Sequence, residues 1–230
     1  MKISGWILVS LGLLFVGMTA VKAQDQQPKV MTVGELLALK QVEADFVIPY
    51  GGEPLQFGEL RLPEGKGPYP VVVIIHGGCW MSAYGLSHIS PLAGAVTGLG
   101  YATWSLEYRR IGNKGGGWPG TFADVADGID CLRLLSEEHP LDLDRVIIMG
   151  HSAGGHLALW SAARMNISAG SPLYRTDPLI PKGVVSLAGI ADLMTAETRK
   201  ICGNAVVKLM GGGSADVPDR YVQGSPAKLL

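Results

Sequence analysis

One stretch constrains the fold of this chain more than any other. Pro70–His76 (PVVVIIH) is continuously apolar and rich in β-branched residues. Such a run is typical of a strand covered on both faces, because a strand with one face in water alternates apolar and polar residues instead. Similar runs at Tyr101–Tyr108, Arg145–Gly150 and Gly183–Ala188 predict three more strands. The sequence therefore predicts a sheet with a buried centre.

Helical patterns lie between these strands. Ser90–Leu99 and Ala153–Arg164 are two of them, and a third begins near Thr121 and continues until His139-Pro140 stops it. Thr121-Phe-Ala-Asp124 resembles a capping box at the start of that third helix. Strands that alternate with helices favour an α/β fold: a mainly parallel, doubly wound sheet with helices on both faces.

The chain divides into three predicted segments. Residues 1–23 have a basic start, a short apolar run and an Ala23 cleavage site, which predicts a signal peptide and export to the periplasm or the medium. A retained N-terminal anchor is the alternative, but the run is shorter than the roughly 20 residues of a membrane span, so no stable span is expected after cleavage. Residues 24–41 are a polar linker. Residues 42–230 form the domain, which opens with strands at Val42–Pro49 and Leu55–Leu62.

Charge and cysteine content exclude several function classes. The chain has 19 basic and 20 acidic residues and a formal net charge of −1, without the basic stripe of a nucleic-acid-binding protein. Its three cysteines, Cys79, Cys131 and Cys202, fit no zinc spacing. We expect them to be small buried residues; one pair can form a disulfide after export, but the sequence does not say which. No metal or organic cofactor is implied.

Gly150-His-Ser-Ala-Gly154 follows a predicted buried strand and opens a predicted helix. In this position the G-x-S-x-G pattern is typical of a nucleophile elbow, where glycines relieve crowding and expose the serine hydroxyl above the sheet. The helix N-terminus favours the negative charge that develops there. Ser152 is therefore the predicted nucleophile. The alternative is a serine that only caps its helix.

A second motif, His76-Gly77-Gly78-Cys79-Trp80, follows the central strand directly. In a hydrolase such a loop brings backbone N–H groups to the substrate oxygen, and the N–H of the residue after the nucleophile completes the oxyanion hole. The alternative is an unrelated turn at the end of a strand.

Together these motifs resemble the esterase branch of the α/β-hydrolases with an HGGxW oxyanion loop. That branch includes acetyl-xylan and feruloyl esterase-like proteins and arylformamidases, and is a cousin of the hormone-sensitive-lipase group. Glu107-Tyr-Arg-Arg110 and Gly116-Gly-Trp-Pro-Gly120 also look like this family, and the resemblance runs from about Val42 to the C-terminus. It implies a nucleophile, three oxyanion donors and a loop-shaping glycine: Ser152; Gly78, Cys79 and Ala153; and Gly77.

The histidines receive structural interpretations. His76 is expected to support the glycine loop by hydrogen bonding. His151 is expected to point into the scaffold, and His88 and His139 to be surface or cap residues. His156 falls one helical turn beyond the nucleophile, where its ring cannot easily reach the hydroxyl.

Aromatic and charged residues near the predicted site have two interpretations each. Trp80, Tyr84 and Trp118 follow strand ends, where a pocket forms, so they are either substrate contacts or packing residues. Glu107 with an arginine of the pair at 109–110 is more consistent with a structural ion pair than with substrate binding.

The catalytic triad is predicted to be incomplete. In this fold the order is serine, then acid, then histidine. The resemblance places the acid and the histidine beyond Leu230, so about 60 residues, or two strand–helix units of about 30, are expected to be missing. We assign no Asp or His of this sequence to the triad, and expect the 230-residue chain alone to be inactive.

Three functions follow from these observations. The first is a serine carboxylic-ester hydrolase that acts on a small or carbohydrate-linked acyl ester. The second is an exported serine peptidase or amidase of the prolyl-oligopeptidase type. The third is a catalytically dead binding module on the hydrolase fold, or a truncated relic.

Overall fold

The computed structural model describes residues 31–230, except 33, 36 and 37, and we describe the unit from Val33 to Leu230 by itself. The predicted signal peptide and most of the predicted linker lie outside the described residues. Within the described part, none of the helices has the length and apolar character that crossing a membrane requires.

The centre of the unit is a six-stranded sheet with the order β1-β2-β4-β3-β5-β6. The first two junctions, β1 with β2 and β2 with β4, are antiparallel, and the remaining three are parallel. The predicted, mainly parallel α/β sheet is therefore confirmed, with an antiparallel hairpin at one side. The strands are β1 Phe46–Pro49, β2 Phe57–Arg61, β3 Tyr69–Ile75, β4 Ala102–Leu106, β5 Leu141–His151 and β6 Gly183–Leu187.

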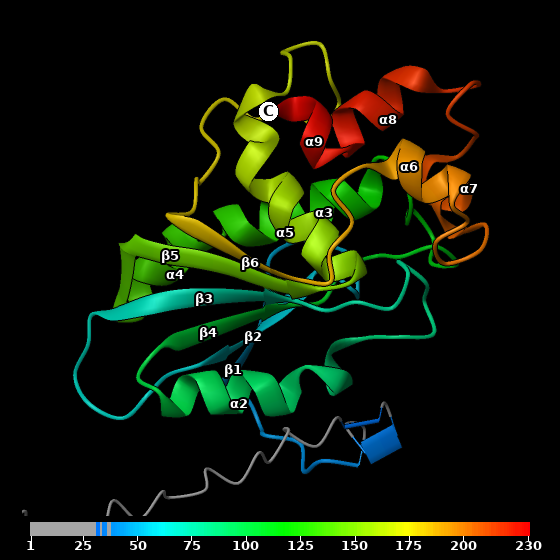
Figure 1. The fold of residues 1–230 in the computed structure, drawn as a ribbon. Coiled ribbons are helices and arrows are strands. Elements are labelled where there is room, and N and C mark those ends of the chain that lie inside the picture. Colours follow the sequence, from blue (N-terminus) through cyan, green and yellow to red (C-terminus); the bar gives the residue numbers. More distant parts are fainter. Residues whose placement is uncertain (1–30, 33, 36–37) are drawn as a thin grey trace, which may run out of the picture. The chain divides into compact units, whose positions relative to one another are not determined.

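Helices lie on both faces of this sheet (Figure 1), with α2 on one face and α3 and α5 on the other. The double winding is thus confirmed. The helices are α2 Ser90–Gly98, α3 Gly120–Asp130, α4 Leu132–Glu138, α5 Ala153–Ala163, α6 Leu193–Thr198, α7 Ala205–Met210, α8 Pro218–Gly224 and α9 Pro226–Leu229, with short 3-10 turns at Leu86–His88 and Arg164–Asn166.

The apolar run of β3 packs against both helical layers. Val71, Val73 and Ile75 belong to the larger core cluster, whereas Val72 and Ile74 belong to a smaller cluster with residues of α2. Successive side chains of a strand point to opposite faces, so only a run without polar interruptions suits a strand buried on both sides. This is the physical reason why Pro70–His76 identified the central strand.

The predicted capping box of α3 is wrong. Helix α3 begins at Gly120 without a side-chain cap. The Thr121 hydroxyl instead accepts the Gly117 N–H at 2.9 Å, and Asp124 accepts the Arg109 Nε–H at 2.8 Å. The Thr121 hydroxyl also donates to the Arg109 carbonyl. Both side chains are thus engaged with Arg109, more than ten residues earlier in the chain, which the local spacing does not reveal. The predicted single helix up to His139 is also divided in two, at Cys131.

The C-terminal region, which no sequence pattern resolved, consists of short helices. Helix α7 ends at Gly211 with φ 72°, and α8 begins with Pro218, so both boundaries use residues suited to them. Helix α9 contacts the 3-10 turn after α5, where Asn166 Nδ2 donates to the Leu229 carbonyl at 2.8 Å. The end of the described chain is thus held against α5.

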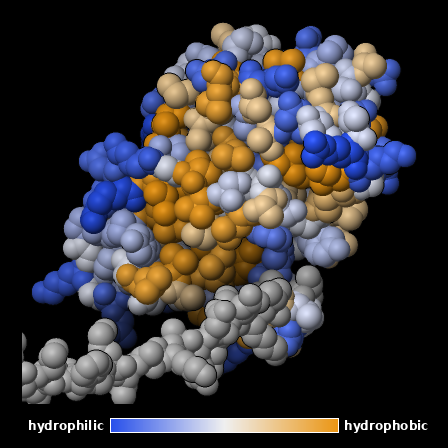
Figure 2. Space-filling model, in the orientation of Figure 1, coloured by the Kyte–Doolittle hydropathy of each residue, from blue (hydrophilic) through white to orange (hydrophobic). Residues whose placement is uncertain are grey.

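Strand β6 has one strand neighbour within the described residues, β5. Val185 and Leu187 of β6 are 36% and 41% exposed. Figure 2 shows apolar residues gathered on the face where Figure 1 places β5 and β6. A sheet edge with exposed apolar side chains is a template for pairing with another strand.

Candidate active site

Ser152 lies in a sharp turn between β5 and α5. Its backbone has φ 54° and ψ −118°, a region that is costly for a residue with a side chain. The Ser152 N–H donates to the Leu187 carbonyl at 2.8 Å, which fixes the turn to the end of β6. The Ser152 hydroxyl makes no capping hydrogen bond, so the alternative that this serine only caps its helix is wrong.

The two glycines of the motif allow the turn to pack. A Cβ at Gly150 would lie 2.2 Å from the Gly154 carbonyl oxygen, and a Cβ at Gly154 would lie 2.1 Å from the Ile75 carbonyl oxygen. Both contacts are with backbone atoms, which cannot move away like the end of a side chain. Glycine at position 154 thus permits β3 to approach the start of α5 closely.

The glycine loop after β3 lies against this turn. A Cβ at Gly77 would be 2.5 Å from the His151 carbonyl oxygen. The following backbone is left-handed at three successive residues, with φ 109° at Gly78, 52° at Cys79 and 55° at Trp80. The structure therefore brings the loop and the predicted nucleophile together, as the carboxyl ends of neighbouring parallel strands do in open α/β sheets.

The three N–H groups predicted as oxyanion donors have no acceptor within the described chain. Gly78, Cys79 and Ala153 donate to no backbone or side-chain atom there. The neighbouring Gly77 N–H differs, because it donates to His88 Nε2 at 3.3 Å. Backbone N–H groups without an acceptor, in a loop that packs against the serine turn, are able to donate hydrogen bonds to an oxyanion.

His76 and Glu107 support the glycine loop that follows β3. The two ring nitrogens of His76 lie 2.8 Å from the Gly77 carbonyl oxygen and 3.1 Å from Glu107 Oε1, and Arg110 Nη1 lies 2.9 Å from the same Glu107 oxygen. Tyr108 stacks on the His76 ring at 4.3 Å. These contacts confirm the structural interpretation of Glu107 and Arg110, and they give His76 the loop-supporting place that was predicted for it.

The electrostatics of this cluster favour a charged carboxylate. Burial raises the pKa of Glu107, but the hydrogen bond with His76 and the charges of His76 and Arg110 outweigh that effect and hold the pKa below its usual range. Arg109 forms a separate ion pair with Asp124, with 2.7 Å between nitrogen and oxygen. Neither arginine is free to bind substrate.

His156 is unable to act as a base for Ser152. Its ring is fully buried and its Nε2 donates to the Gly224 carbonyl at 2.8 Å. Burial lowers the pKa of His156 to about 4, partly opposed by that hydrogen bond. The predicted exclusion of this histidine is confirmed.

Two other histidine predictions are wrong. His151 is exposed rather than directed into the scaffold. His88 is half-buried and accepts the Gly77 N–H, so it is part of the loop support and not a surface residue. Burial, together with the neighbouring His76, lowers the pKa of His88, which favours the neutral ring that this bond needs.

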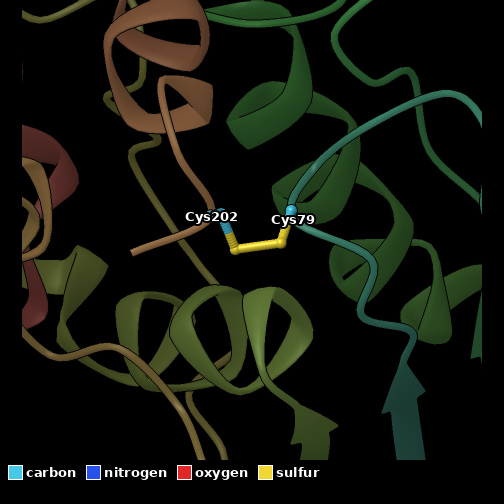
Figure 3. The surroundings of a disulfide bond; sticks show 2 residues. All are labelled: Cys79 and Cys202. Atoms are coloured by element: carbon cyan, nitrogen blue, oxygen red, sulfur yellow. A yellow bond between two sulfur atoms is a disulfide. The ribbon is translucent and has the colours of Figure 1, made fainter. Parts of the chain in front are cut away.

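A disulfide joins the glycine loop after β3 to the segment after α6. Cys79 and Cys202, 123 residues apart in sequence, are bonded, with their Cα atoms 5.8 Å apart (Figure 3). The alternative that one pair forms a disulfide is therefore confirmed for these two, which are half-buried. Cys131 is free and half-buried. Local sequence gives no signal for a pairing over this distance.

A pocket of about 380 Å³ borders Ser152. Its walls come from the segment after β6, from α6 and from the residues between α6 and the disulfide: Ala188, Gly189, Ile190, Ala191, Asp192, Thr195, Ala196, Arg199 and Ile201. Sequence patterns missed this wall, because α6 is short and its residues are not unusual. Nowhere in the described part of the chain do three or more potential metal ligands cluster.

The aromatic residues predicted for the pocket lie elsewhere. Trp80 is fully buried and packs edge-to-face on His156 with ring centres 5.3 Å apart, so the packing alternative describes it. Trp118 is half-buried and packs on Phe122. Tyr84 is 47% exposed and lies against Gly78, which places it beside the glycine loop after β3.

A comparison with family models decides the family. The BD-FAE family model matches residues 59–230, three quarters of the chain. The chain belongs to the BD-FAE family of α/β-hydrolase esterases. The resemblance predicted from the HGGxW and G-x-S-x-G motifs is thereby confirmed at the level of the fold and the esterase family.

Individual relatives agree with this family. Esterase LipQ of Mycobacterium tuberculosis is 28% identical over 128 residues, which cover 56% of this chain and 30% of LipQ. The uncharacterised peptidase YtmA of Bacillus subtilis is 27% identical over 172 residues, covering 74% of this chain and 60% of YtmA. A truncated carbohydrate esterase from gut microbiota has the same fold, with a TM-score of 0.67 at 21% identity, over 83% of this chain and 73% of that one. This BD-FAE chain thus spans less than two thirds of either curated relative.

Proposed function

We propose that this chain supplies the nucleophile and the oxyanion hole of a serine carboxylic-ester hydrolase. The observation that carries the proposal is the strained serine turn beside three backbone N–H groups without an acceptor: Gly78, Cys79 and Ala153. A neutral binding site has no need for such unpaired donors, whereas an oxyanion accepts hydrogen bonds from all of them.

The reaction follows from this arrangement. Ser152 Oγ attacks the ester carbonyl as its proton passes to a base, and the carbonyl oxygen becomes an anion held by the three N–H groups. The intermediate expels the alcohol, which takes up the proton, and leaves an acyl group on Ser152. Water then attacks the acyl-enzyme, releases the carboxylic acid and restores the serine.

The base is a histidine held by an acid, and we place both in sequence that follows residue 230. The triad order in this fold supports that position. The contacts of the described histidines support it too, since His76, His88 and His156 are engaged with Glu107, Gly77 and Gly224. The complete protein, rather than the 230-residue chain, is then the active enzyme.

The proposed substrate is a small or carbohydrate-linked acyl ester. A pocket of about 380 Å³ lies at the small end of the ligand sites found in proteins, which suits a short acyl or sugar group. The structural similarity to a protein named as a carbohydrate esterase is consistent with this choice.

We also propose that the protein is exported after cleavage of residues 1–23. The Cys79–Cys202 disulfide supports export, because such bonds persist outside the reducing cytosol. The intact mass of the protein from its natural source tests both ends of the chain. A mature N-terminus at Gln24 is expected. An N-terminus at Met1 argues against cleavage, and a C-terminus at Leu230 argues against a completed triad.

Labelling with a fluorophosphonate probe tests the nucleophile. The complete wild-type protein is expected to be labelled at one serine, identified as Ser152 by peptide mass spectrometry, and to hydrolyse 4-nitrophenyl acetate. The matched control is Ser152→Ala, which is expected to lose both properties. Labelling that persists in Ser152→Ala, or absence of labelling in a folded wild-type protein, would show that this assignment is wrong.

A second candidate keeps the site and changes the bond. Similarity to YtmA, named as a peptidase, favours an amidase or peptidase. Comparing the kcat/KM for an acyl ester with that for the matching peptide anilide distinguishes the two. If a folded complete protein has neither activity, the binding module remains.

A further inference from the structure

The pocket beside Ser152 has two charged side chains in its wall, Asp192 and Arg199. Both oxygens of the Asp192 carboxylate have partners within the described chain. One oxygen accepts the Thr195 N–H at 2.8 Å, which caps α6, and the other lies 3.8 Å from Lys228 Nζ. The negative charge of the pocket is therefore opposed by a cation of its own chain.

The Arg199 guanidinium differs from the Asp192 carboxylate in its partners. It has no hydrogen-bond or ion-pair partner within the described residues, and the side chain is exposed. A guanidinium has five donors in a planar fork that matches a carboxylate. All other arginines in this part of the chain donate to a carboxylate or a backbone carbonyl: Arg61, Arg109, Arg110, Arg133, Arg145, Arg164, Arg175 and Arg220.

The backbone that carries Arg199 is fixed. Helix α6 ends in a Schellman motif, in which the Ile201 N–H donates to the Ala196 carbonyl and the Lys200 N–H donates to the Glu197 carbonyl, both at 2.9 Å. Lys200 takes the left-handed position of this motif, with φ 52°. Arg199 therefore extends from an ordered helix end and not from a free loop.

The disulfide fixes the same segment to the catalytic loop. Cys202, three residues after Arg199, is bonded to Cys79 (Figure 3), whose N–H is one of the proposed oxyanion donors. Ile201, between them, lines the pocket together with Ser152. The disulfide thus links the segment that carries Arg199 to the loop of the proposed oxyanion hole. A ligand bound to Arg199 therefore has a defined position relative to Ser152.

We infer that Arg199 forms a carboxylate-binding subsite, and that the preferred substrate is an ester carrying a carboxylate on the part that enters this pocket. This inference rests on the proposed ester-hydrolase function and names its substrate class. The carboxylate accepts hydrogen bonds from the guanidinium and keeps its charge throughout the reaction. Because Arg199 is exposed, the contact is screened by salt, and the preference weakens as ionic strength rises.

Binding is measured first, because it does not depend on turnover. The complete Ser152→Ala protein is titrated, with detection by NMR, with monomethyl glutarate and with its neutral analogue dimethyl glutarate. We expect the monoester to bind about fivefold more tightly at low salt, the modest effect of an exposed ion pair. Arg199→Gln in the same background is expected to abolish that preference.

Arg133→Gln is the matched control, since its ion pair with Asp177 is exposed and Arg133 does not line the pocket. It is expected to keep the preference for the monoester. Absence of monoester binding, equal affinity for the two esters, or a preference that survives Arg199→Gln overturns the inference.

Hydrolysis separates this inference from the proposed function. Turnover of dimethyl glutarate by the protein with Ser152 intact tests the ester-hydrolase function alone. The ratio of kcat/KM for the two esters, compared between wild type and Arg199→Gln, tests the subsite. Hydrolysis of the neutral ester without any effect of Arg199→Gln on the ratio supports the function and contradicts the subsite. A protein that hydrolyses neither ester contradicts the function, and the binding comparison still decides about Arg199.

Discussion

The Cys79–Cys202 disulfide is expected to contribute much of the stability of this unit. It closes a loop across 123 residues. In the chain-entropy description a cross-link over that distance lowers the entropy of the unfolded chain by an amount worth about 5 kcal/mol, and measured effects are commonly about 2–4 kcal/mol. For a unit of roughly 200 residues, each kcal/mol corresponds to about 2 °C in Tm. Replacing both cysteines by serine is therefore expected to lower the Tm by about 4–10 °C.

Thermal unfolding followed by circular dichroism, with and without reductant, measures this effect. Reductant is expected to lower the Tm of the wild type to that of Cys79→Ser/Cys202→Ser, and to leave the double variant unchanged. Cys131→Ser is the matched control, because Cys131 is free, and its response to reductant is expected to equal that of the wild type. A decrease in Tm below about 1 °C in the double variant, or an equal response of that variant to reductant, refutes the reasoning.

Two further predictions concern residues around the serine turn. Gly154→Ala is expected to lower the free energy of unfolding by about 3 kcal/mol in denaturant titrations, because its Cβ would lie 2.1 Å from the Ile75 carbonyl oxygen; Gly98→Ala at the end of α2, where a Cβ meets nothing within 4 Å, is the control, and an equal loss in both variants contradicts the steric argument. The second concerns pH. The pKa of buried His156 is about 4 in the folded chain, below the value of about 6.5 for an unfolded histidine. The unfolded chain therefore takes up a proton first as the pH falls, and the free energy of unfolding decreases between about pH 6.5 and 4, by about 3 kcal/mol from this residue. His156→Gln is expected to reduce the slope over that interval, whereas an unchanged slope assigns it to other groups.

Residues close in sequence allowed the centre of the fold and the serine turn to be predicted. The buried strand at Pro70–His76 could be recognised because burial on both faces demands an uninterrupted apolar run. The elbow could be recognised because its two glycines meet backbone atoms and allow few other residues. Both constraints act within a few residues of the chain, so they leave a mark on the local sequence.

The pocket could not be predicted in the same way. Trp80, Tyr84 and Trp118 follow strand ends, yet Trp80 is fully buried and none of the three lines the pocket at Ser152. Arg199 and the other wall residues come from α6 and the segments beside it, which are held by contacts with α7, α8 and α9. A short helix with common residues carries no local sign of what it will cover.

By itself, the sequence determined the α/β class, the central strand, the position of Ser152 and the esterase branch, because each depends on a local pattern of residues. Only the tertiary structure decided the partners of those elements. The Cys79–Cys202 pair, the support of the Gly77 N–H by His88 and the place of Arg199 in one pocket with Ser152 join segments separated along the chain. Such contacts are selected by the packing of the whole unit, so no local spacing specifies them.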